Sequence, residues 1–311
     1  MKDNKLTVKK IINMFNFPLL AGEKHEDNEI QVYGLNRAGL ELSGYKRSTE
    51  ISQRRIILLS NKEYEYIQSI KKEEVLKRYE QLTQSFTPLI IITDKFKDDK
   101  LIAVAKKNDC PLVKFSKMNT STITQLILSF EEKFFSNKTE VHASLINVFG
   151  KGVLIKGKSG IGKSEVSLEL VKNKHLFIGD DRIVIRQKGL SVIGAAHHSL
   201  KNLIEVRGLG ILDLKKIYGV QFITDESKID LIINLISKTD NQFKQIDRLG
   251  MDFKTEKILE TSLPYINIPV VSGRNLSDLI EASVAKLKLY LNDKDDYKKV
   301  FEQLNFQENL E

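Results

Sequence analysis

The chain has 311 residues, of which 41% are hydrophobic and 29% are charged. This composition excludes a mainly disordered chain and leaves room for two ordinary domains, each with its own core. The formal net charge is +8, but the lysines are scattered among acids and tryptophan is absent. We therefore predict a solvated surface and no nucleic-acid partner.

The chain contains no apolar run that approaches the roughly 20 residues needed to span a bilayer, so we expect no membrane segment. The charged start, Met1–Lys5, leads into an amphipathic stretch and does not resemble a secretory signal. The single cysteine, Cys110, rules out an internal disulfide and is typical of a reducing compartment. These observations predict a cytoplasmic protein.

The first part of the chain alternates short apolar runs with helical patterns. Three of the runs predict buried strands, at residues 55–59, 89–93 and 111–115. Residues 62–79 and 121–134 have helical spacing, and the second stretch opens with a Ser/Thr cluster suited to capping. This alternation predicts an α/β domain over residues 1–136, with the polar stretch 135–140 as its boundary.

The second part, residues 137–311, begins with two apolar runs at 144–149 and 152–156 that flank Gly150 and Lys151. This pattern predicts a β-hairpin. We expect a helix after Ser164, and strands at residues 176–179 and 182–186. Near the end, apolar residues recur at helical spacing over 275–291, which predicts one more helix.

The strongest motif lies in this second part and matches G-x-x-x-x-G-K-[ST] in full. It consists of Gly157, Lys158, Ser159, Gly160, Ile161, Gly162, Lys163 and Ser164. Glycines let successive backbone N–H groups curl around an anion, and the following helix adds its positive end. In such a loop the lysine reaches the β- and γ-phosphates, and the serine hydroxyl can bind Mg²⁺. We predict a nucleoside-triphosphate site here.

A pair of acids, Asp180 and Asp181, follows the apolar run 176–178 only one helix after this loop. Phosphate-binding loops need a carboxylate at a neighbouring strand end to hold Mg²⁺ or water. Adjacent strand residues point to opposite sides, so one acid can face the metal and the other an incoming hydroxyl. The short separation predicts a compact P-loop core. The alternative is a β-turn with two solvated aspartates.

Three further features are ambiguous by themselves. Glu205 and Arg207 alternate with apolar residues and are expected on one strand face, before Gly208 and Gly210, which permit close approach of a ligand. They fit either a metal and phosphate site or a cross-strand ion pair. Arginine stands near glycine again at residues 247–250 and 272–275, a pattern found in phosphate clamps and in turns. The lone His142 fits a structural role as well as a catalytic one.

Taken together, these motifs resemble the HPr kinase/phosphorylase family of bacteria. The resemblance covers nearly the whole chain, and its motifs agree in order and spacing. They are His142, residues 157–165 (Gly-Lys-Ser-Gly-Ile-Gly-Lys-Ser-Glu), 179–182 (Gly-Asp-Asp-Arg), 205–210 (Glu-Val-Arg-Gly-Leu-Gly), 247–250 (Asp-Arg-Leu-Gly) and 273–276 (Gly-Arg-Asn-Leu). The family places its acidic pair one short helix after the P-loop, a trait shared with phosphoenolpyruvate carboxykinase.

The resemblance implies a bifunctional enzyme of carbon-catabolite regulation. Such an enzyme transfers phosphate from ATP, or in some members from pyrophosphate, to a serine of the phosphocarrier protein HPr. It reverses the reaction by phosphorolysis, in which inorganic phosphate attacks the phosphoserine and pyrophosphate leaves. Mg²⁺ is the implied metal, and a homohexamer built on the C-terminal domain is the implied assembly.

The resemblance also implies roles for single residues. Asp181 would accept the proton in the kinase direction and donate it in the reverse direction. Lys163, His142 and Arg248 match active-site positions, and Ser164 and Glu205 match Mg²⁺ ligands. The stretch 204–213, with Arg207, Gly208 and Gly210, is tied to both activities, and 269–274, with Pro269, Gly273 and Arg274, is tied to dephosphorylation. The chain departs from the family pattern at a few positions, which include Ala38, Arg54, His197, His198 and Ser272.

We therefore expect in-line transfer in which the P-loop and Lys163 hold the β-phosphate while Asp181 deprotonates the target serine. Two alternatives use the same core. One is a small-molecule or carboxykinase-like phosphotransferase, and the other is a non-catalytic module that senses nucleotide.

Overall fold

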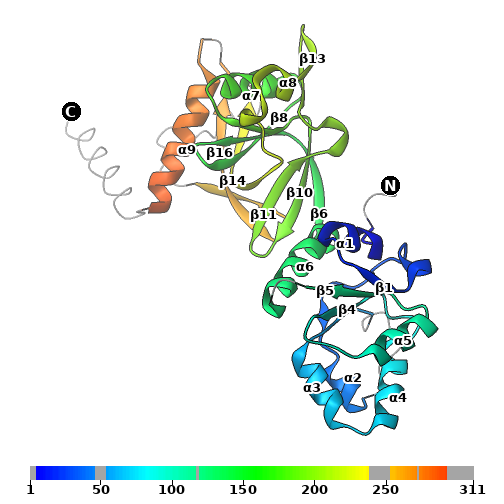
Figure 1. Ribbon diagram of the computed structural model, residues 1–311. Helices are drawn as coiled ribbons and strands as arrows, with labels where there is room; N and C mark the ends of the chain where they lie inside the picture. Colours follow the sequence, from blue (N-terminus) through cyan, green and yellow to red (C-terminus); the bar gives the residue numbers. More distant parts are fainter. Residues whose placement is uncertain (1–4, 46–53, 117–118, 238–252, 272, 293–311) are drawn as a thin grey trace, which may run out of the picture. The chain divides into compact units, whose positions relative to one another are not determined.

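The computed structural model describes residues 5–45, 54–116, 119–237, 253–271 and 273–292 (Figure 1). The chain divides into two compact units, Met1–Ser136 and Asn137–Glu311. Both units combine helices with sheet, as expected for an α/β protein. Arg248 and Ser272 lie outside the described residues.

The N-terminal unit is built on one sheet in the order β1-β5-β4-β3-β2. Its strands are β1 (Leu19–Ala21), β2 (Leu35–Asn36), β3 (Ile56–Leu59), β4 (Ile90–Thr93) and β5 (Leu112–Phe115). The last four run parallel, and β1 pairs antiparallel with β5. Helices cover both faces, so β3 and the apolar part of β4 are buried on both sides and read as continuous apolar runs in the sequence.

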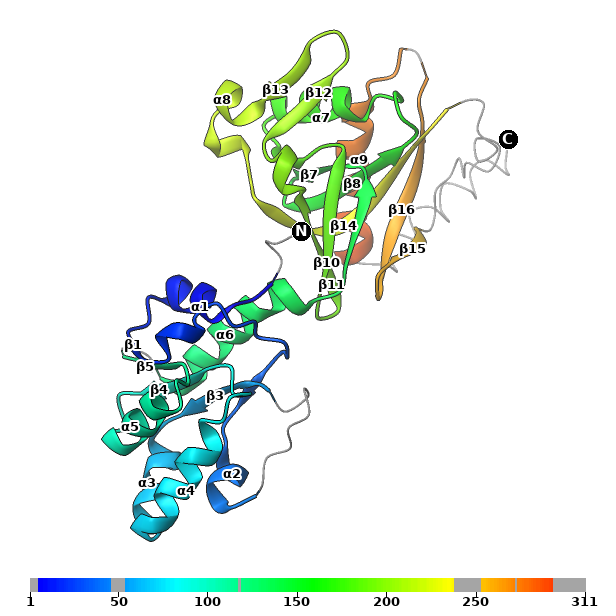
Figure 2. The ribbon, with the colours of Figure 1, turned by 90° about the vertical axis from the view of Figure 1, so that its right-hand side faces the viewer.

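Helices form the two outer layers of this unit (Figures 1 and 2). Apolar contacts place α1 (Val8–Phe15) and α6 (Thr120–Phe135) on one face of the sheet. The other face is covered by α2 (Gly39–Ser43), α3 (Asn61–Ser69), α4 (Lys72–Leu82) and α5 (Asp99–Lys107).

The single helix predicted over residues 62–79 is wrong, because α3 and α4 are separate helices. The backbone of Ile70 and Lys71 is extended, and each helix then packs its own apolar side onto the same core. The cap of α6 also differs from the expected Ser/Thr cluster. The side chain of Asn119 accepts a hydrogen bond from the backbone N–H of Thr122 at 2.8 Å.

The C-terminal unit is built around the long strand β14 (Glu226–Ile236). Its beginning pairs antiparallel with β11, and the rest runs parallel to β8 and β16. The strand order is β6-β10-β11-β14-β8-β7-β9, with β16 also beside β14 and β15 beside β16. The remaining bounds are β6 (Lys138–His142), β7 (Ser144–Val148), β8 (Lys151–Gly157), β9 (Leu176–Gly179), β10 (Arg182–Lys188), β11 (Ser191–Ala196), β15 (Lys254–Ile258) and β16 (Thr261–Pro269).

A smaller hairpin, β12 (Leu203–Val206) with β13 (Gly210–Asp213), packs beside this sheet, followed by the short helix α8 (Leu214–Tyr218). The helices α7 (Lys163–Lys172) and α9 (Leu276–Asn292) cover one sheet face through a shared apolar core (Figure 2). A second apolar cluster packs side chains of β7, β8 and β14 against those of β10 and β11. No helix within the described ranges is long and apolar enough to cross a membrane.

The predicted hairpin is present as β7 and β8, but its turn is Phe149–Gly150, one residue earlier than expected. Val148 pairs with Lys151, and both turn residues have positive φ, as a two-residue hairpin turn of type I′ requires. The three parallel strands β8, β14 and β16 end at one edge of the sheet, where Gly157 lies beside Leu235, and Ile236 beside Pro269. Ligands of parallel α/β sheets bind at this carboxyl edge, so the sheet positions the phosphate motif there.

Candidate active site

The phosphate motif forms the turn that joins β8 to α7. Gly160 and Gly162 have φ values of 76° and 110°, a backbone conformation that glycine adopts without strain. A Cβ atom on Gly160 would lie 2.8 Å from an Arg207 guanidinium nitrogen, so this glycine also leaves space for that side chain. Gly162 caps α7, and the N-terminus of the helix therefore opens into the site.

Lys163 lies in the first turn of α7 and is buried, with 6% of its surface exposed. Its Nζ donates hydrogen bonds to the carbonyl oxygens of Gly157 at 3.1 Å and Lys158 at 3.3 Å. The ammonium group is thus held against the mouth of the loop, where it adds a positive charge to the partial charge of the helix end.

Asp180 is the centre of a buried hydrogen-bond network, with 3% of its surface exposed. The Ser164 hydroxyl donates to its Oδ2 at 2.6 Å, and the Ser144 hydroxyl donates to its Oδ1 at 2.5 Å. Both carboxylate oxygens are therefore oriented by neighbours on α7 and β7. A buried acid fixed against the P-loop serine is the arrangement that a Mg²⁺ site at this position needs.

Asp181 turns the other way, toward solvent and His142. Its φ of 66° lies in the left-handed region, which aspartate tolerates better than most residues. Its Oδ1 lies 2.8 Å from Nδ1 of His142, and both side chains are about half exposed. The last residue of β6, His142, pairs across the sheet with Arg182, and this register places the imidazole beside the acid.

Arg182 follows Asp181 directly and has its own partner. Its guanidinium pairs with Glu140 at 2.5 Å, and this hydrogen bond holds the pKa of Glu140 below its usual range. Arg182 therefore pairs with Glu140, whereas Asp181 pairs with His142.

The hairpin of β12 and β13 supplies one wall of the site. Glu205 lies on β12, but Arg207 follows the end of that strand and begins the turn, so the expectation that both share a strand face is wrong. The turn brings Arg207 over Gly160. Ile211 lies directly opposite Glu205 on the paired strand and is 68% exposed, so an apolar side chain flanks the same face.

These side chains meet in one pocket of the C-terminal unit. It combines one lysine and one arginine, a histidine and several carboxylates around the start of α7. The residues that line it are His142, Ser159, Gly160, Gly162, Lys163, Ser164, Glu165, Asp180, Asp181, Glu205 and Arg207. Cationic groups for a polyphosphate, oxygen ligands for a hard metal ion and an acid–histidine pair for proton transfer are thus within one cavity.

Comparison with known proteins gives one consistent result. The model of the HPr Serine kinase N terminus matches residues 6–130, and that of the HPr Serine kinase C-terminal domain matches residues 133–304. The chain is 43% identical to the HPr kinase/phosphorylase of Mycoplasma mycoides, over 97% of this chain and 96% of the relative. It is 34% identical to that of Bacillus subtilis, over 92% and 91% of the two chains.

The chain belongs to the HPr serine kinase family. Among solved structures, the Hpr(Ser) kinase/phosphatase from Coxiella burnetii is 31% identical, with a TM-score of 0.47, and the match covers 52% of this chain and 98% of that one.

Not all positions that the family resemblance singled out lie in the pocket. The described residues that line the pocket do not include Gly208, Gly210, Pro269, Gly273 or Arg274. Gly208 and Gly210 have positive φ values of 85° and 77°, so they shape the hairpin turn beside Arg207. Pro269 ends β16, and the loop after it leaves the sheet at the same edge as the P-loop.

Ser144 belongs to the site, although the sequence did not predict it. Its hydroxyl holds the buried Asp180, yet the two residues are 36 positions apart and no motif joins them. The sequence offered one signal for this role, namely a polar serine at the start of the otherwise apolar run 144–149. Glu165, which lies in the pocket directly after the motif, was also not among the predicted site residues.

Proposed function

We propose that this protein transfers a phosphoryl group from ATP to a serine of the phosphocarrier protein HPr, and that it removes this group by phosphorolysis. The observation that carries the proposal is the pairing of two features in one pocket. A complete P-loop holds Lys163 and Ser164 at the start of α7, and the Asp181–His142 pair lies at the same cavity. Relatives named HPr kinase/phosphorylase match nearly the whole chain.

The phosphate end of ATP would bind in the P-loop. Lys163 and the N-terminus of α7 supply positive charge for the β- and γ-phosphates. Arg207 lies over Gly160 and can neutralise charge that develops on the transferred group. Arg248, outside the described residues, is proposed to share this task with His142.

The residues at the P-loop fit Mg²⁺. The donor set consists of the Ser164 hydroxyl, which already contacts Asp180 at 2.6 Å, and the carboxylates of Asp180 and Glu205 in the same pocket. Mg²⁺ prefers such hard oxygen ligands and usually binds through a few protein groups plus substrate phosphates. When bound, the ion would supply positive charge to the phosphate oxygens. We propose Ser164 and Glu205 as ligands, with Asp180 as a third.

Asp181 is the proposed base. It is half exposed at the pocket, whereas Asp180 is buried and accepts two serine hydroxyls, so only Asp181 is accessible to a hydroxyl of another protein. His142 lies 2.8 Å from it and can orient the carboxylate toward the incoming serine. In the reverse direction Asp181 would return the proton to serine, since the same group must act in both directions.

The acceptor protein must cover the pocket mouth to bring its serine to Asp181. The exposed Ile211 beside Glu205 offers an apolar contact at this rim. A homohexamer is part of the same proposal and can be tested by analytical ultracentrifugation. The alternatives of a small-molecule phosphotransferase and a nucleotide sensor have less support, because both halves of the chain match HPr serine kinase models.

The test is direct. HPr is incubated with the protein, ATP and Mg²⁺, and its mass is measured before and after excess inorganic phosphate is added. We expect a gain of one phosphoryl group on serine, then its loss with release of pyrophosphate. Nucleotide binding without any change in the mass of HPr would contradict the proposal and favour a sensor.

A further inference from the structure

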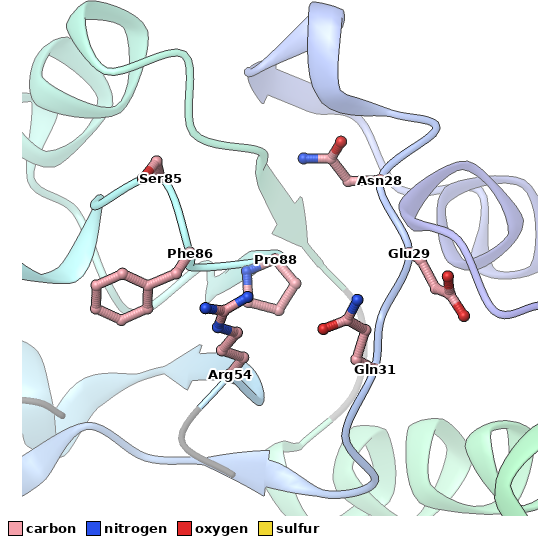
Figure 3. Close-up of a pocket in the computed structure, with 7 residues that line it drawn as sticks. All are labelled: Asn28, Glu29, Gln31, Arg54, Ser85, Phe86 and Pro88. Carbon is pink, nitrogen blue, oxygen red and sulfur yellow. The ribbon is translucent and has the colours of Figure 1, made fainter. Parts of the chain in front are cut away.

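A pocket of the N-terminal unit and the P-loop pocket hold their carboxylates in different ways. In the N-terminal unit, Glu29 is the one acid among the described lining residues, and it forms an ion pair with Lys5 at 2.5 Å. Figure 3 shows its side chain pointing away from the other labelled side chains. In the P-loop pocket, Asp180 is instead buried, and each of its two oxygens accepts a serine hydroxyl. The second arrangement holds a carboxylate in one orientation.

A bulge in β9 decides which side of the sheet Asp180 faces. The register between β7 and β9 shifts at Leu145, which leaves Ile178 as an extra residue on β9. Ile178 packs on the face that β10 and β11 cover, and a Cβ atom on Gly179 would meet side chains of the same two strands. The usual alternation of sides is thus interrupted, and Asp180 faces α7.

Ser144 fixes the orientation of this carboxylate from below. It is the first residue of β7 and is fully buried. Its hydroxyl donates to Oδ1 of Asp180 at 2.5 Å, while the Ser164 hydroxyl donates to Oδ2 at 2.6 Å. The two donors belong to different elements, β7 and α7, so the carboxylate cannot turn without breaking a hydrogen bond. A turn that brought both oxygens to one ion would leave the buried Ser144 hydroxyl without this acceptor, which is costly in a protein interior.

We propose that Ser144 is a positioning residue that selects Mg²⁺ over Ca²⁺ at the P-loop. This inference rests on the proposed Mg²⁺ site of the phosphotransfer function, with Asp180 as a ligand. Mg²⁺ demands near-ideal octahedral geometry and is bound through few protein oxygens, whereas Ca²⁺ accepts more oxygen ligands and bidentate carboxylates. Because Ser144 holds Oδ1, Asp180 offers only Oδ2 to an ion in the pocket that it lines.

Loss of the Ser144 hydroxyl should therefore change the preference of the site and not only its strength. The freed Oδ1 could join Oδ2 in a bidentate contact, which the larger ion accepts and the octahedral ion does not. Ser144 touches neither the nucleotide pocket nor an ion itself, because it is absent from the lining and acts through Asp180.

The test measures metal preference on the full chain with the non-hydrolysable ATP analogue AMP-PNP bound. Mn²⁺ is the probe, followed by electron paramagnetic resonance, and Mg²⁺ and Ca²⁺ are titrated as competitors. AMP-PNP supplies the same phosphate oxygens in every variant, so a change in the ratio of the two affinities comes from the protein. For Ser144→Ala we expect the affinity for Ca²⁺ relative to Mg²⁺ to rise at least about fivefold.

Three further variants control this result. Ser144→Cys, with a weakly donating thiol, should shift the preference in the same direction as Ser144→Ala and gives a second reading. Ser144→Thr keeps a hydroxyl and should keep the original preference. Ser283→Ala is the matched control, because it removes a buried hydroxyl that donates to the Leu279 carbonyl on α9 at 2.7 Å, and it should leave the preference unchanged.

An unchanged preference in Ser144→Ala and Ser144→Cys would overturn the proposal, as would an equal rise in Ser144→Thr or Ser283→Ala. An equal loss of affinity for both ions would also overturn it, because it would show a structural role only. Absence of bound Mn²⁺ from the original chain would overturn it together with the proposed Mg²⁺ site.

Phosphorylation of HPr by the same samples with ATP and Mg²⁺ separates this inference from the proposed function. A shifted preference in Ser144→Ala, when the original chain does not phosphorylate HPr, would refute the proposed function alone. Phosphorylated HPr together with an unchanged metal preference would refute the role of Ser144 alone.

Discussion

Replacing the buried Glu131 by glutamine tests how burial controls a charge inside the N-terminal unit. Glu131 lies on α6 with none of its surface exposed. Its Oε2 accepts the backbone N–H of Gly34 at 2.8 Å, and its Oε1 has no hydrogen-bond partner among the described residues. Burial raises the pKa of Glu131 to about 7, against the smaller opposing effects of the Gly34 bond and the charge of Arg55.

The magnitude follows from this pKa. Well below pH 4.5 the carboxyl is protonated in both the folded and the unfolded chain. Between pH 4.5 and about 7 the folded chain keeps a proton that the unfolded chain has released, so the free energy of unfolding falls as the pH rises. A pKa difference of about 2.5 at about 1.4 kcal/mol per unit predicts a loss of about 3 kcal/mol above pH 7.

The assay is urea-induced unfolding at pH 5, 6, 7 and 8. Glu131→Gln has a neutral side chain at every pH, so its free energy of unfolding relative to the original chain should rise by about 2–3 kcal/mol from pH 5 to pH 8 and level off above pH 7. Glu132→Gln, at the adjacent, less buried position, controls for the loss of one negative charge. A stability difference for Glu131→Gln that is the same at all four pH values would refute the reasoning.

Three further predictions concern the candidate active site. Asp181→Asn should lower phosphotransfer to HPr by about 10²-fold or more while nucleotide affinity, measured by calorimetry, stays near normal, because only the base is lost; full activity would remove Asp181 from this role. Lys163→Ala should weaken ATP and pyrophosphate binding together, since one ammonium group serves both ligands, and a loss confined to one of them would show separate sites. Ile211→Asp should raise KM for HPr at least about threefold with kcat retained, because a charge replaces an apolar contact beside Glu205. The control is Leu190→Asp, at a site that is 96% exposed on the turn after β10, and it should leave the KM for HPr unchanged. Equal effects of the two changes on KM would argue against docking of HPr at Ile211.

Local patterns were sufficient for the strands with continuous apolar runs, but they did not predict β14, the central strand of the C-terminal sheet. The apolar runs that became β3, β4 and β5 are buried on both faces or nearly so, and their composition reports that burial directly. The break between α3 and α4 could not be predicted in the same way. Apolar spacing continues across Ile70, and only packing of each helix on the sheet decides that the backbone there is extended.

The amino-acid sequence by itself determined the phosphate loop, because eight consecutive residues contain the glycines, lysine and serine whose local backbone forms the cradle. Only the tertiary structure decided how the two acids after β9 divide their contacts. Asp180 is buried against Ser144 and Ser164, whereas Asp181 meets His142. Sheet pairing between strands that are distant in the chain brings these partners together, and such register depends on the packing of the whole domain and not on any local run of residues.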